Sequence, residues 1–386
     1  MILEPILILS FLLCVLVTAG MVEYFLHQRT IRMIPLRVHV NGSRGKSSVV
    51  RLIAAGLRGG GKRAFAKTTG TLPRIIGDNN SEWAIKRHGG ASIGEQIRII
   101  RKLAKKQPEI YVVECMAVKP EYQHLTEHQM IHATHGVITN ARMDHLDEMG
   151  PTYDDVVNSL LNTRPRNGKL YFGDHSLEET HRSAGHHERD LSEWIERFKY
   201  QEHEENINLA LDVCNDLGVD DETALRGMIN AHPDPGALQV LHIENDGNMI
   251  CFANGFAAND PGSTKQVWDL VRRRNSLPDY FVILLNSRSD RFFRSKQLAS
   301  MIGREFSPNA VFLMGQRTNI LKKIIVKNGF SKKQITDFGE KSANAIILKL
   351  MDSLKGKDVT VFSIGNIGLQ GGAVVEILDD LSKEFA

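Results

Sequence analysis

The stretch Val38-His39-Val40-Asn41-Gly42-Ser43-Arg44-Gly45-Lys46-Ser47-Ser48 decides the fold of this chain. Apolar and polar residues alternate over 36–41, which predicts a strand, and helical periodicity over 47–57 predicts a helix directly after it. Between them, two glycines allow backbone N–H groups to face a phosphate, and the helix N-terminus adds its dipole. The order Gly-x-x-Gly-Lys-Ser therefore predicts a phosphate loop, in which Lys46 reaches the β- and γ-phosphates and Ser47 binds Mg²⁺.

Two further stretches carry polar residues that suit such a site. Glu114 lies near the end of the short, mainly apolar stretch 110–115. A carboxylate at the end of a parallel strand borders the ligand crevice and can hold Mg²⁺. Further along, Asn140 is followed by Asp144, His145 and Asp147 within one short stretch. The three stretches together predict a nucleotide and metal site.

The N-terminus has a different composition from the rest of the chain. Residues 5–22 carry no charge and lie between Glu4 and Glu23. A helix of this length spans about 27 Å, close to the thickness of the hydrocarbon core of a bilayer. Arg29, Arg32 and Arg37 follow, and no basic residue precedes. The positive-inside rule therefore predicts a single-pass anchor in the cell membrane, with the rest of the chain in the cytoplasm; a buried core helix is the alternative.

Composition excludes several classes of protein. The 386 residues carry 48 Lys and Arg against 45 Asp and Glu, a net charge of +3, so no strong field indicates a nucleic acid partner. Hydrophobic residues make up 42% and charged residues 24%, which are globular values. The four cysteines form no Cys-x-x-Cys pair, which excludes a zinc ribbon or a thioredoxin-like motif.

Strands and helices alternate twice along the chain, which predicts an α/β fold with parallel-rich sheets. The two halves are separated by His232-Pro233-Asp234-Pro235-Gly236, where two prolines and a glycine cannot continue a helix. We therefore expect a membrane anchor helix over 1–28, an ATP-binding domain over 34–232 and a smaller, Rossmann-like α/β domain over 238–386.

The phosphate loop is two residues shorter than the usual Gly-x₄-Gly-Lys-Ser/Thr, and this form, with Glu114 and the stretch 138–150, resembles the Mur ligases, which are ATP-dependent amide-forming ligases. The resemblance implies a Mur-ligase-like central domain in which Glu114 and His145 hold Mg²⁺ and Asn140 and Asp144 lie beside the γ-phosphate. It also implies that Asn206, in a His-x-x-Asn sequence, contacts adenine. The expected ATP-binding residues are Asn41, Gly42, Ser43, Arg44, Gly45, Lys46, Ser47, Ser48, Asn140 and Asn206; the expected catalytic residues are Lys46, Glu114, Asp144 and His145; and the expected metal ligands are Ser47, Glu114 and His145.

One Mur ligase feature is missing. The family usually carries a carbamylated lysine about 15 residues after the metal histidine, and here Leu160 stands in that place. Lys169 lies too far along the chain to replace it, so Asn162 or water is expected to do so.

Six longer motifs resemble one branch of the superfamily, the ATP-dependent ligase subunits of poly-γ-glutamate synthases. These motifs lie at 68–73, 94–96, 113–118, 142–152, 254–261 and 365–368. The resemblance implies that a glutamate or chain carboxylate is activated as an acyl phosphate and joined in a γ-amide link, with release of ADP and phosphate. It also implies a capsular or released polymer, small membrane partner subunits and possible homo-oligomers. The residues assigned to the substrate are Thr69, Thr71, Asn259, Asp260, Arg288 and Arg291.

Two other functions remain open at this point. A folylpolyglutamate-type ligase shares the motifs, but a soluble folate substrate needs no membrane anchor. A membrane-anchored P-loop ATPase that drives polymer export shares the phosphate loop, but it has no use for Asp-His-x-Asp and would normally carry Asp in place of Glu114.

Four histidines, His124, His128, His132 and His135, follow near-helical spacing. A zinc site is one interpretation, but no further ligand accompanies them at a fixed spacing. We expect a helix face near the domain surface instead.

Overall fold

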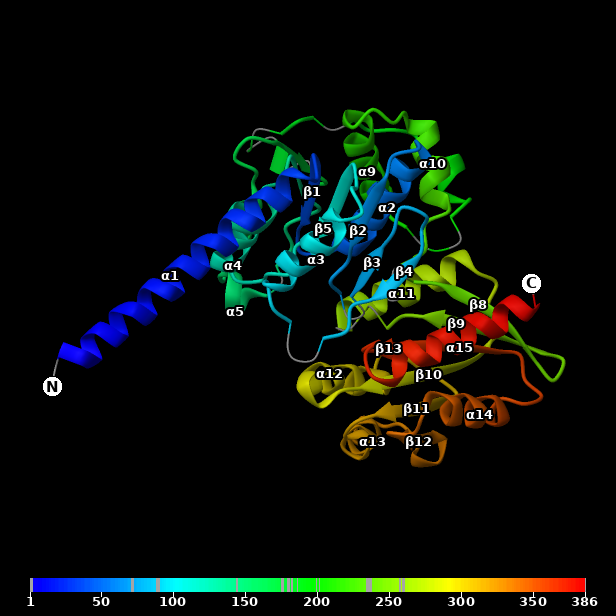
Figure 1. The fold of residues 1–386 in the computed structure, drawn as a ribbon. Coiled ribbons are helices and arrows are strands. Elements are labelled where there is room, and N and C mark those ends of the chain that lie inside the picture. Colours follow the sequence, from blue (N-terminus) through cyan, green and yellow to red (C-terminus); the bar gives the residue numbers. More distant parts are fainter. Residues whose placement is uncertain are drawn as a thin grey trace. The chain divides into compact units, whose positions relative to one another are not determined.

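The computed structural model describes residues 3–70, 73–87, 91–143, 145–174, 177–178, 181, 183–185, 187–198, 200, 202–233, 238–256, 258 and 261–385. The chain divides into two compact units. The first comprises Met1–Arg197 with Glu202–His232, and the second comprises Phe198–Gln201 with Pro233–Ala386. Figure 1 shows the elements of both units in chain order, and each unit is described by itself below.

The chain begins with one long helix, α1 (Leu3–Arg32). Among the described residues, Ile6–Arg32 is the one segment long and apolar enough to cross a membrane. Its apolar side chains from Ile6 to Val22 are exposed, whereas His27 and Ile31 in its last turns are buried against the first unit. Figure 1 shows α1 as one unbroken helix (blue).

The first unit is built on a seven-stranded sheet in the order β4-β3-β2-β5-β1-β6-β7. Five neighbouring strands, β2, β5, β1, β6 and β7, pair in parallel. Strands β3 and β4 add an antiparallel edge next to β2. The strands are β1 (Leu36–Asn41), β2 (Ala64–Lys67), β3 (Arg74–Ile76), β4 (Glu82–Ala84), β5 (Ile110–Glu114), β6 (His135–Ile138) and β7 (Lys169–Phe172). The helical segments are α2 (Lys46–Gly59), α3 (Glu95–Ala104), α4 (Pro120–Leu125), the π-helix η1 (Thr126–Ile131), α5 (Leu146–Met149), α6 (Tyr153–Leu160), η2 (Leu161–Thr163), α8 (Ser192–Ile195), α9 (Glu204–Asp216) and α10 (Asp221–Ile229).

Alternate residues of the strands face different helices, as the two-residue period of a strand requires. On one face, Ile99, Ile100 and Leu103 of α3 pack with Phe65 and Tyr111 of the sheet. On the other face lies α2, which contacts β1, β2 and β5 and packs against α9 and α10. Lys67 and Glu114 lie at the ends of neighbouring strands but on opposite faces of the sheet. Lys67 therefore points to α3 and Glu114 points to α2.

The second unit is a six-stranded sheet in the order β12-β11-β10-β13-β9-β8, in which only β8 is antiparallel to its neighbour. One core packs α14 and α15 on one face, and a second core packs α11, α12 and α13 on the other. The strands are β8 (Val240–Asn245), β9 (Asn248–Asn254), β10 (Tyr280–Ser287), β11 (Ala310–Gly315), β12 (Ile335–Gly339) and β13 (Val359–Gly365). The helices are α11 (Pro261–Arg274), η3 (Ser289–Arg291), α12 (Phe292–Ile302), α13 (Thr318–Lys327), η4 (Lys332–Gln334), α14 (Ala343–Ser353) and α15 (Gln370–Phe385).

The predicted α/β fold with parallel-rich sheets is confirmed. The expected single helix face for the four histidines is wrong. The helical segment ends at Ile131, His132 follows in the left-handed region with φ of 50°, and His135 lies on β6. Among the described residues, no group of three or more His, Cys, Asp or Glu side chains is placed to hold a metal ion.

Candidate nucleotide and metal site

The phosphate loop connects β1 to α2, as the sequence predicted. Gly42 has φ of 136° and Gly45 has φ of 79°, backbone conformations that L side chains rarely adopt. A Cβ on Gly42 would lie 2.0 Å from Oγ1 of Thr139, so this position also has no room for a side chain. The two glycines are therefore required by the path of the loop itself.

The loop is held in place by the segment after β6. The backbone N–H of Arg44 donates to Oδ1 of Asn140 at 3.1 Å, and Nδ2 of Asn140 donates back to the Arg44 carbonyl at 3.2 Å. Thr139 Oγ1 donates to the same carbonyl at 2.5 Å, and Ser43 Oγ bonds to the backbone of Arg142 at 2.9 Å. The structure thus brings Asn140 to the loop as a positioning residue; the sequence analysis missed Thr139 and Arg142.

The side chain of Lys46, the first residue of α2, folds back onto the phosphate loop. Its Nζ donates to the carbonyl of Gly42 at 2.6 Å and of Ser43 at 3.3 Å. The carbonyl contacts keep one positive charge beside the glycine turn, at the N-terminus of α2. Both the ammonium and the helix dipole favour an anion at this place.

Glu114 is the point where three segments meet. Its carboxylate is nearly inaccessible, with 3% of the residue exposed. Oε2 accepts the Ser47 hydroxyl at 2.8 Å and the backbone N–H of Thr69 at 2.6 Å. The Glu114 carbonyl also accepts Nε2 of Gln96 at 3.4 Å. A strand end, the first turn of α2 and the segment after β2 therefore converge on one carboxylate.

The Ser47 and Glu114 pair suits Mg²⁺. A hydroxyl and a carboxylate oxygen are hard donors, and Mg²⁺ in phosphate sites usually takes one or two carboxylates and completes its shell with water and phosphate oxygens. Ser47 and Glu114, predicted as ligands from the sequence, lie within hydrogen-bond distance of each other. Thr69, predicted for substrate, contributes its backbone N–H to this cluster.

Other predicted residues are less completely placed. His145 precedes α5 with φ of 53° and is exposed, so its assignment to Mg²⁺ stays a prediction. Asp144, Thr71, Asn259 and Asp260 lie outside the described residues.

Two asparagines make contacts that the sequence did not predict. Asn41 is buried, and its Nδ2 donates to Oε1 of Gln123 at 2.7 Å and to Oγ1 of Thr163 at 3.2 Å. The Asn41 amide is used inside the fold because the last residue of β1 points to the α4 side of the sheet, and its predicted contact with ATP stays a prediction. Asn206 donates to Glu202 at 2.8 Å, and its Oδ1 lies 3.0 Å from where a Cβ on Gly45 would stand. Asn206 therefore packs against the phosphate loop, and its predicted contact with adenine stays a prediction.

A buried ionic network, which the sequence analysis missed, lies at the end of β2. Lys67 is fully buried, and its Nζ lies 2.9 Å from Oε1 of Glu95 in the first turn of α3. Glu95 also accepts from Arg87, at 2.6 Å from Nε and 3.0 Å from Nη2. Burial raises the pKa of Glu95, but the hydrogen bonds and charges of Arg87 and Lys67 outweigh it and lower the pKa to about 2. The next residue along α3 is Gln96, so this network borders the Glu114 cluster.

Lys169 and Asn162 both follow the position of the missing Mur ligase lysine, and both bond to other parts of the fold. Lys169 begins β7, and its ammonium pairs with Asp216, away from the carboxyl ends of the strands. Asn162 donates to the carbonyls of Asn158 at 3.2 Å and Ser159 at 3.0 Å, so its amide closes the turn that follows α6.

In the second unit, three arginines line a small pocket at the carboxyl ends of β10 and β13. The lining residues are Arg288, Arg291, Arg294, Ser295, Leu298, Gly365 and Asn366. Arg288 is held by Asp290 at 2.7 Å and by Oδ1 of Asn366 at 3.3 Å. Burial, followed by the charges of Arg294 and Arg288, lowers the pKa of Arg291. The structure thus brings the two predicted arginines together and adds Arg294, an arrangement that suits a carboxylate or phosphate.

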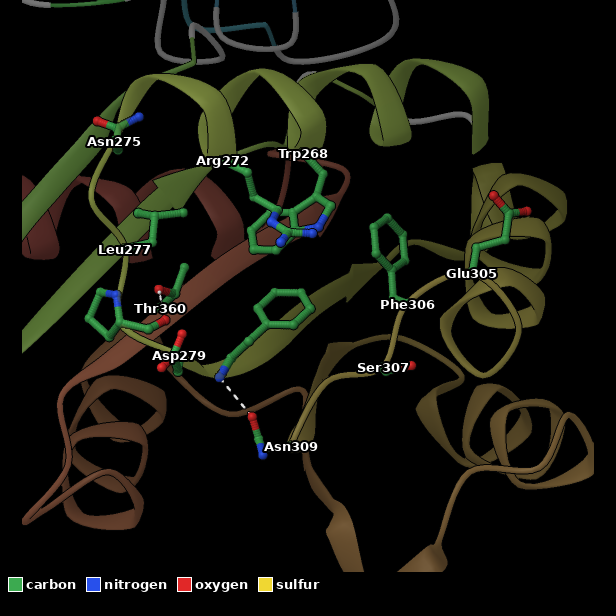
Figure 2. Close-up of a pocket in the computed structure, with 12 residues that line it drawn as sticks. Trp268, Arg272, Asn275, Leu277, Asp279, Glu305, Phe306, Ser307, Asn309 and Thr360 are labelled. Atoms are coloured by element: carbon green, nitrogen blue, oxygen red, sulfur yellow. Dashed lines mark hydrogen bonds between the residues drawn. The ribbon is translucent and has the colours of Figure 1, made fainter.

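A larger cleft of about 540 Å³ lies at the amino-terminal ends of the same two strands. Figure 2 shows the side chains of Trp268 and Arg272, which come from α11, and the ring of Phe306 beside them. Trp268 stacks on Phe281 with ring centroids 4.2 Å apart, and the backbone N–H of Phe281 donates to Asn309 at 2.8 Å. Ligands of open α/β sheets bind at the carboxyl ends of the strands, so this cleft is not the site that the sequence predicted.

Two family models match the chain: the Mur ligase middle domain over residues 40–163 and the poly-gamma-glutamate synthase CapB C-terminal domain over residues 240–381. The chain is 35% identical over 384 residues to the capsule biosynthesis protein CapB of Bacillus anthracis, covering 96% of this chain and 81% of that protein. It is 34% identical over 365 residues to the PGA synthase CapB of Bacillus subtilis (strain 168), covering 92% of each. This chain belongs to the CapB family of poly-γ-glutamate synthases. Membership confirms the predicted family and the predicted class of enzyme, an ATP-dependent amide-bond ligase.

Solved structures of Mur ligase type share the fold of this CapB family member. A Mycobacterium tuberculosis folylpolyglutamate synthase complexed with ADP and AMPPCP matches with a TM-score of 0.61 at 13% identity, covering 92% of this chain and 93% of that one. MurF of Acinetobacter baumannii matches with a TM-score of 0.62 at 14% identity, covering 94% of this chain and 80% of that one. These identities show the fold alone, and they confirm the predicted Mur-ligase-like architecture.

Proposed function

We propose that this chain is the ligase of a membrane-bound poly-γ-glutamate synthase. It uses ATP and Mg²⁺ to activate a carboxylate of glutamate, or of the growing chain, and joins it to an amine in a γ-amide link. The observation that carries the proposal is the convergence of Ser47, Thr69 and Glu114 beside the phosphate loop.

The proposed reaction brings a substrate carboxylate next to the phosphates of ATP, and both are negatively charged. A carboxylate is a poor electrophile, so its oxygen first attacks the γ-phosphorus of ATP, and ADP leaves. The amine nitrogen then attacks the acyl carbon and loses a proton, and phosphate leaves with one oxygen of the original carboxylate. Lys46 and the N–H groups of the loop offset the repulsion between ATP and the carboxylate, and bound Mg²⁺ supplies further neutralisation of phosphate charge.

The residues of the first unit divide this work. Ser47 and Glu114 hold Mg²⁺, and Lys46 binds the phosphates. Asn140 and Asn206 keep the backbone of the loop in its phosphate-binding conformation, by the hydrogen bonds to Arg44 and the packing against Gly45. Under this proposal His145 adds a metal ligand, as the Mur ligase resemblance implies.

The arginine pocket of the second unit is the proposed site for a carboxylate of glutamate or of the polymer. Arg288 and Arg291 are the primary donors, since planar guanidinium groups match a carboxylate with paired hydrogen bonds. Arg294 adds a third positive charge to the same pocket.

We further propose that α1 spans the cell membrane once, with both units in the cytoplasm. The support is the uncharged segment before Glu23 and the basic residues that follow it. In that case α1 would contact the small membrane subunits of the synthase within the bilayer.

The test uses glutamate labelled with ¹⁸O in both carboxyl groups, supplied with ATP and Mg²⁺ to the chain in its membrane together with its partner subunits. Labelled phosphate released with ADP is the expected result. Lys46→Ala should abolish the release, and Lys349→Ala, on an exposed face of α14, should leave it unchanged. Unlabelled phosphate, released equally with and without glutamate, would refute the ligase and indicate an ATPase that drives export.

A further inference from the structure

Helix α3 carries a row of basic side chains that the proposed reaction does not use. Its apolar residues are buried in the core of the first unit. Its outward face and the turn after it carry Arg98, Arg101, Lys102, Lys105 and Lys106, of which Arg101 is half-buried and the other four are exposed. We call these five residues the basic face of α3.

The basic face lies where α1 leaves the first unit. Nη2 of Arg101 is 3.2 Å from Oε1 of Glu23, and Glu23 is the first charged residue after the uncharged segment 5–22. Nearby, Nε2 of His27 lies 2.9 Å from the Met130 carbonyl, and the Gln28 amide lies 3.2 Å from Nε2 of His132. These contacts hold the last turns of α1 against the first unit, so the basic face is fixed close to the end of the apolar segment.

Few acids neutralise this face. Glu23 pairs with Arg101. Of two other acidic residues in this region, Asp78 accepts from Nε of Arg63 and Glu109 accepts from the backbone N–H of Arg63. The Arg63 guanidinium also donates to the Lys106 carbonyl. Within the described part of the chain, no ion pair joins an acidic side chain to Arg98, Lys102, Lys105 or Lys106.

Aromatic side chains accompany the basic face. Nζ of Lys106 lies 5.6 Å from the centroid of the Trp83 ring, and 44% of Trp83 is exposed. Tyr24, next to Glu23 on α1, is 51% exposed. Tryptophan and tyrosine are enriched at the level of lipid headgroups, and basic clusters beside a membrane helix bind anionic lipids.

We propose that the basic face of α3 docks on anionic lipid headgroups and fixes the orientation of the first unit on the membrane. The inference rests on the proposed membrane span of α1, because Glu23 marks the headgroup level only if residues 5–22 are in the bilayer. Docking would orient a helix whose first turn contacts the site, since Gln96 bonds to the Glu114 carbonyl at 3.4 Å.

The test measures the rate at which Lys102 is acetylated by a soluble lysine reagent, read by mass spectrometry. The full chain is placed in nanodiscs of phosphatidylcholine alone or of phosphatidylcholine with phosphatidylglycerol. Acetylation of Lys102, relative to Lys332 and Lys333 of the same molecule, should slow in the anionic nanodiscs and recover at high salt. Each basic residue near an anionic surface contributes about fivefold to docking, so Arg98→Gln with Lys105→Gln should reduce the ratio of docked to free chain about 25-fold.

A matched control, Lys323→Gln with Lys327→Gln on exposed positions of α13, removes the same charge and should leave the protection of Lys102 intact. Equal acetylation in both lipids overturns the inference. Protection that appears only after a membrane partner or poly-γ-glutamate is added also overturns it, in favour of that ligand. Extraction of the chain by alkaline carbonate would instead refute the membrane span, whereas a retained chain with an insensitive Lys102 refutes only the docking.

Discussion

Replacing Glu95 by Gln tests the buried network at the end of β2. Glu95 is 4% exposed and pairs with Lys67 at 2.9 Å and with Arg87 at 2.6 Å, while Lys67 is fully buried. The substitution keeps the shape of the side chain and removes its charge. Lys67 would then remain in the core without a counter-charge, which is costly because the low dielectric of the interior disfavours the ion.

The magnitude follows from the pKa of Glu95. Against burial, Arg87 and Lys67 lower this pKa from its ordinary value of 4.5 to about 2. The difference corresponds to about 3 kcal/mol of folding free energy. Because the pKa is lowered in the folded state, this stabilisation is complete above about pH 4.5 and is lost as the pH falls towards about 2. Breaking a buried pair costs about 3–5 kcal/mol, so both routes give a loss of about 3 kcal/mol for Glu95→Gln at pH 7.

The assay is urea unfolding of the full chain in detergent, followed by hydrogen exchange of the peptides that contain β2 and α3. Glu95→Gln should unfold more easily at pH 7 and should lack the part of the acid destabilisation that begins near pH 4.5. Adding Lys67→Met should restore part of the loss, since no buried ion then lacks a partner. Glu222→Gln is the control, because that carboxylate is 64% exposed in its pair with Arg226 and should matter by less than about 1 kcal/mol. If Glu95→Gln behaves like this control, or if the Lys67→Met loss simply adds to it, the reasoning is refuted.

Three further substitutions test the sites. Glu114→Gln should raise the Mg²⁺ concentration needed for ATP turnover by at least about 10-fold, which a titration of activity measures; an unchanged requirement would exclude Glu114 as a ligand. Gly45→Ala should destabilise the loop by about 1–2 kcal/mol, because φ is 79° and the new Cβ would lie 3.0 Å from Oδ1 of Asn206, and weaker ATP binding in calorimetry checks it. Arg288→Ala should raise KM for glutamate about 10- to 100-fold through the loss of a charged hydrogen bond, whereas Arg273→Ala, on exposed α11, should not; equal effects would remove the pocket from the reaction.

The phosphate loop and Glu114 were predictable because their geometry is local. The glycines at positions 42 and 45 allow the backbone path of the loop. Glu114 is the last residue of a parallel strand, and that position alone places it at the carboxyl edge of the sheet. The short antiparallel strands Arg74–Ile76 and Glu82–Ala84 were not predicted. Three residues are too few to show a period, and the pairing of these strands depends on the sheet edge that they cover.

The sequence also did not predict which face of the sheet a residue at the end of a strand would point to. Asn41 and Lys67 resemble ligand-facing polar residues, but both point away from the α2 face on which Glu114 lies. Their partners, Gln123 and Glu95, are 82 and 28 positions away, and only the packing of α4 and α3 on the sheet brings them near. In the second unit, Arg294 joined the predicted arginines because one turn of α12 brings it back to the same pocket.

The continuity of α1 has a mechanical consequence. The helix runs from Leu3 to Arg32 without interruption, so the nine residues from Tyr24 onward form a stiff stalk about 13 Å long. Helices adjust to bilayers of different thickness by tilting. If α1 spans the membrane as proposed, a stalk with no hinge transmits that tilt to the first unit, and a thinner bilayer would tip the phosphate loop relative to the membrane plane. Under the proposed function, bilayer thickness would then be a variable that alters polymer synthesis without any change in ATP, Mg²⁺ or glutamate.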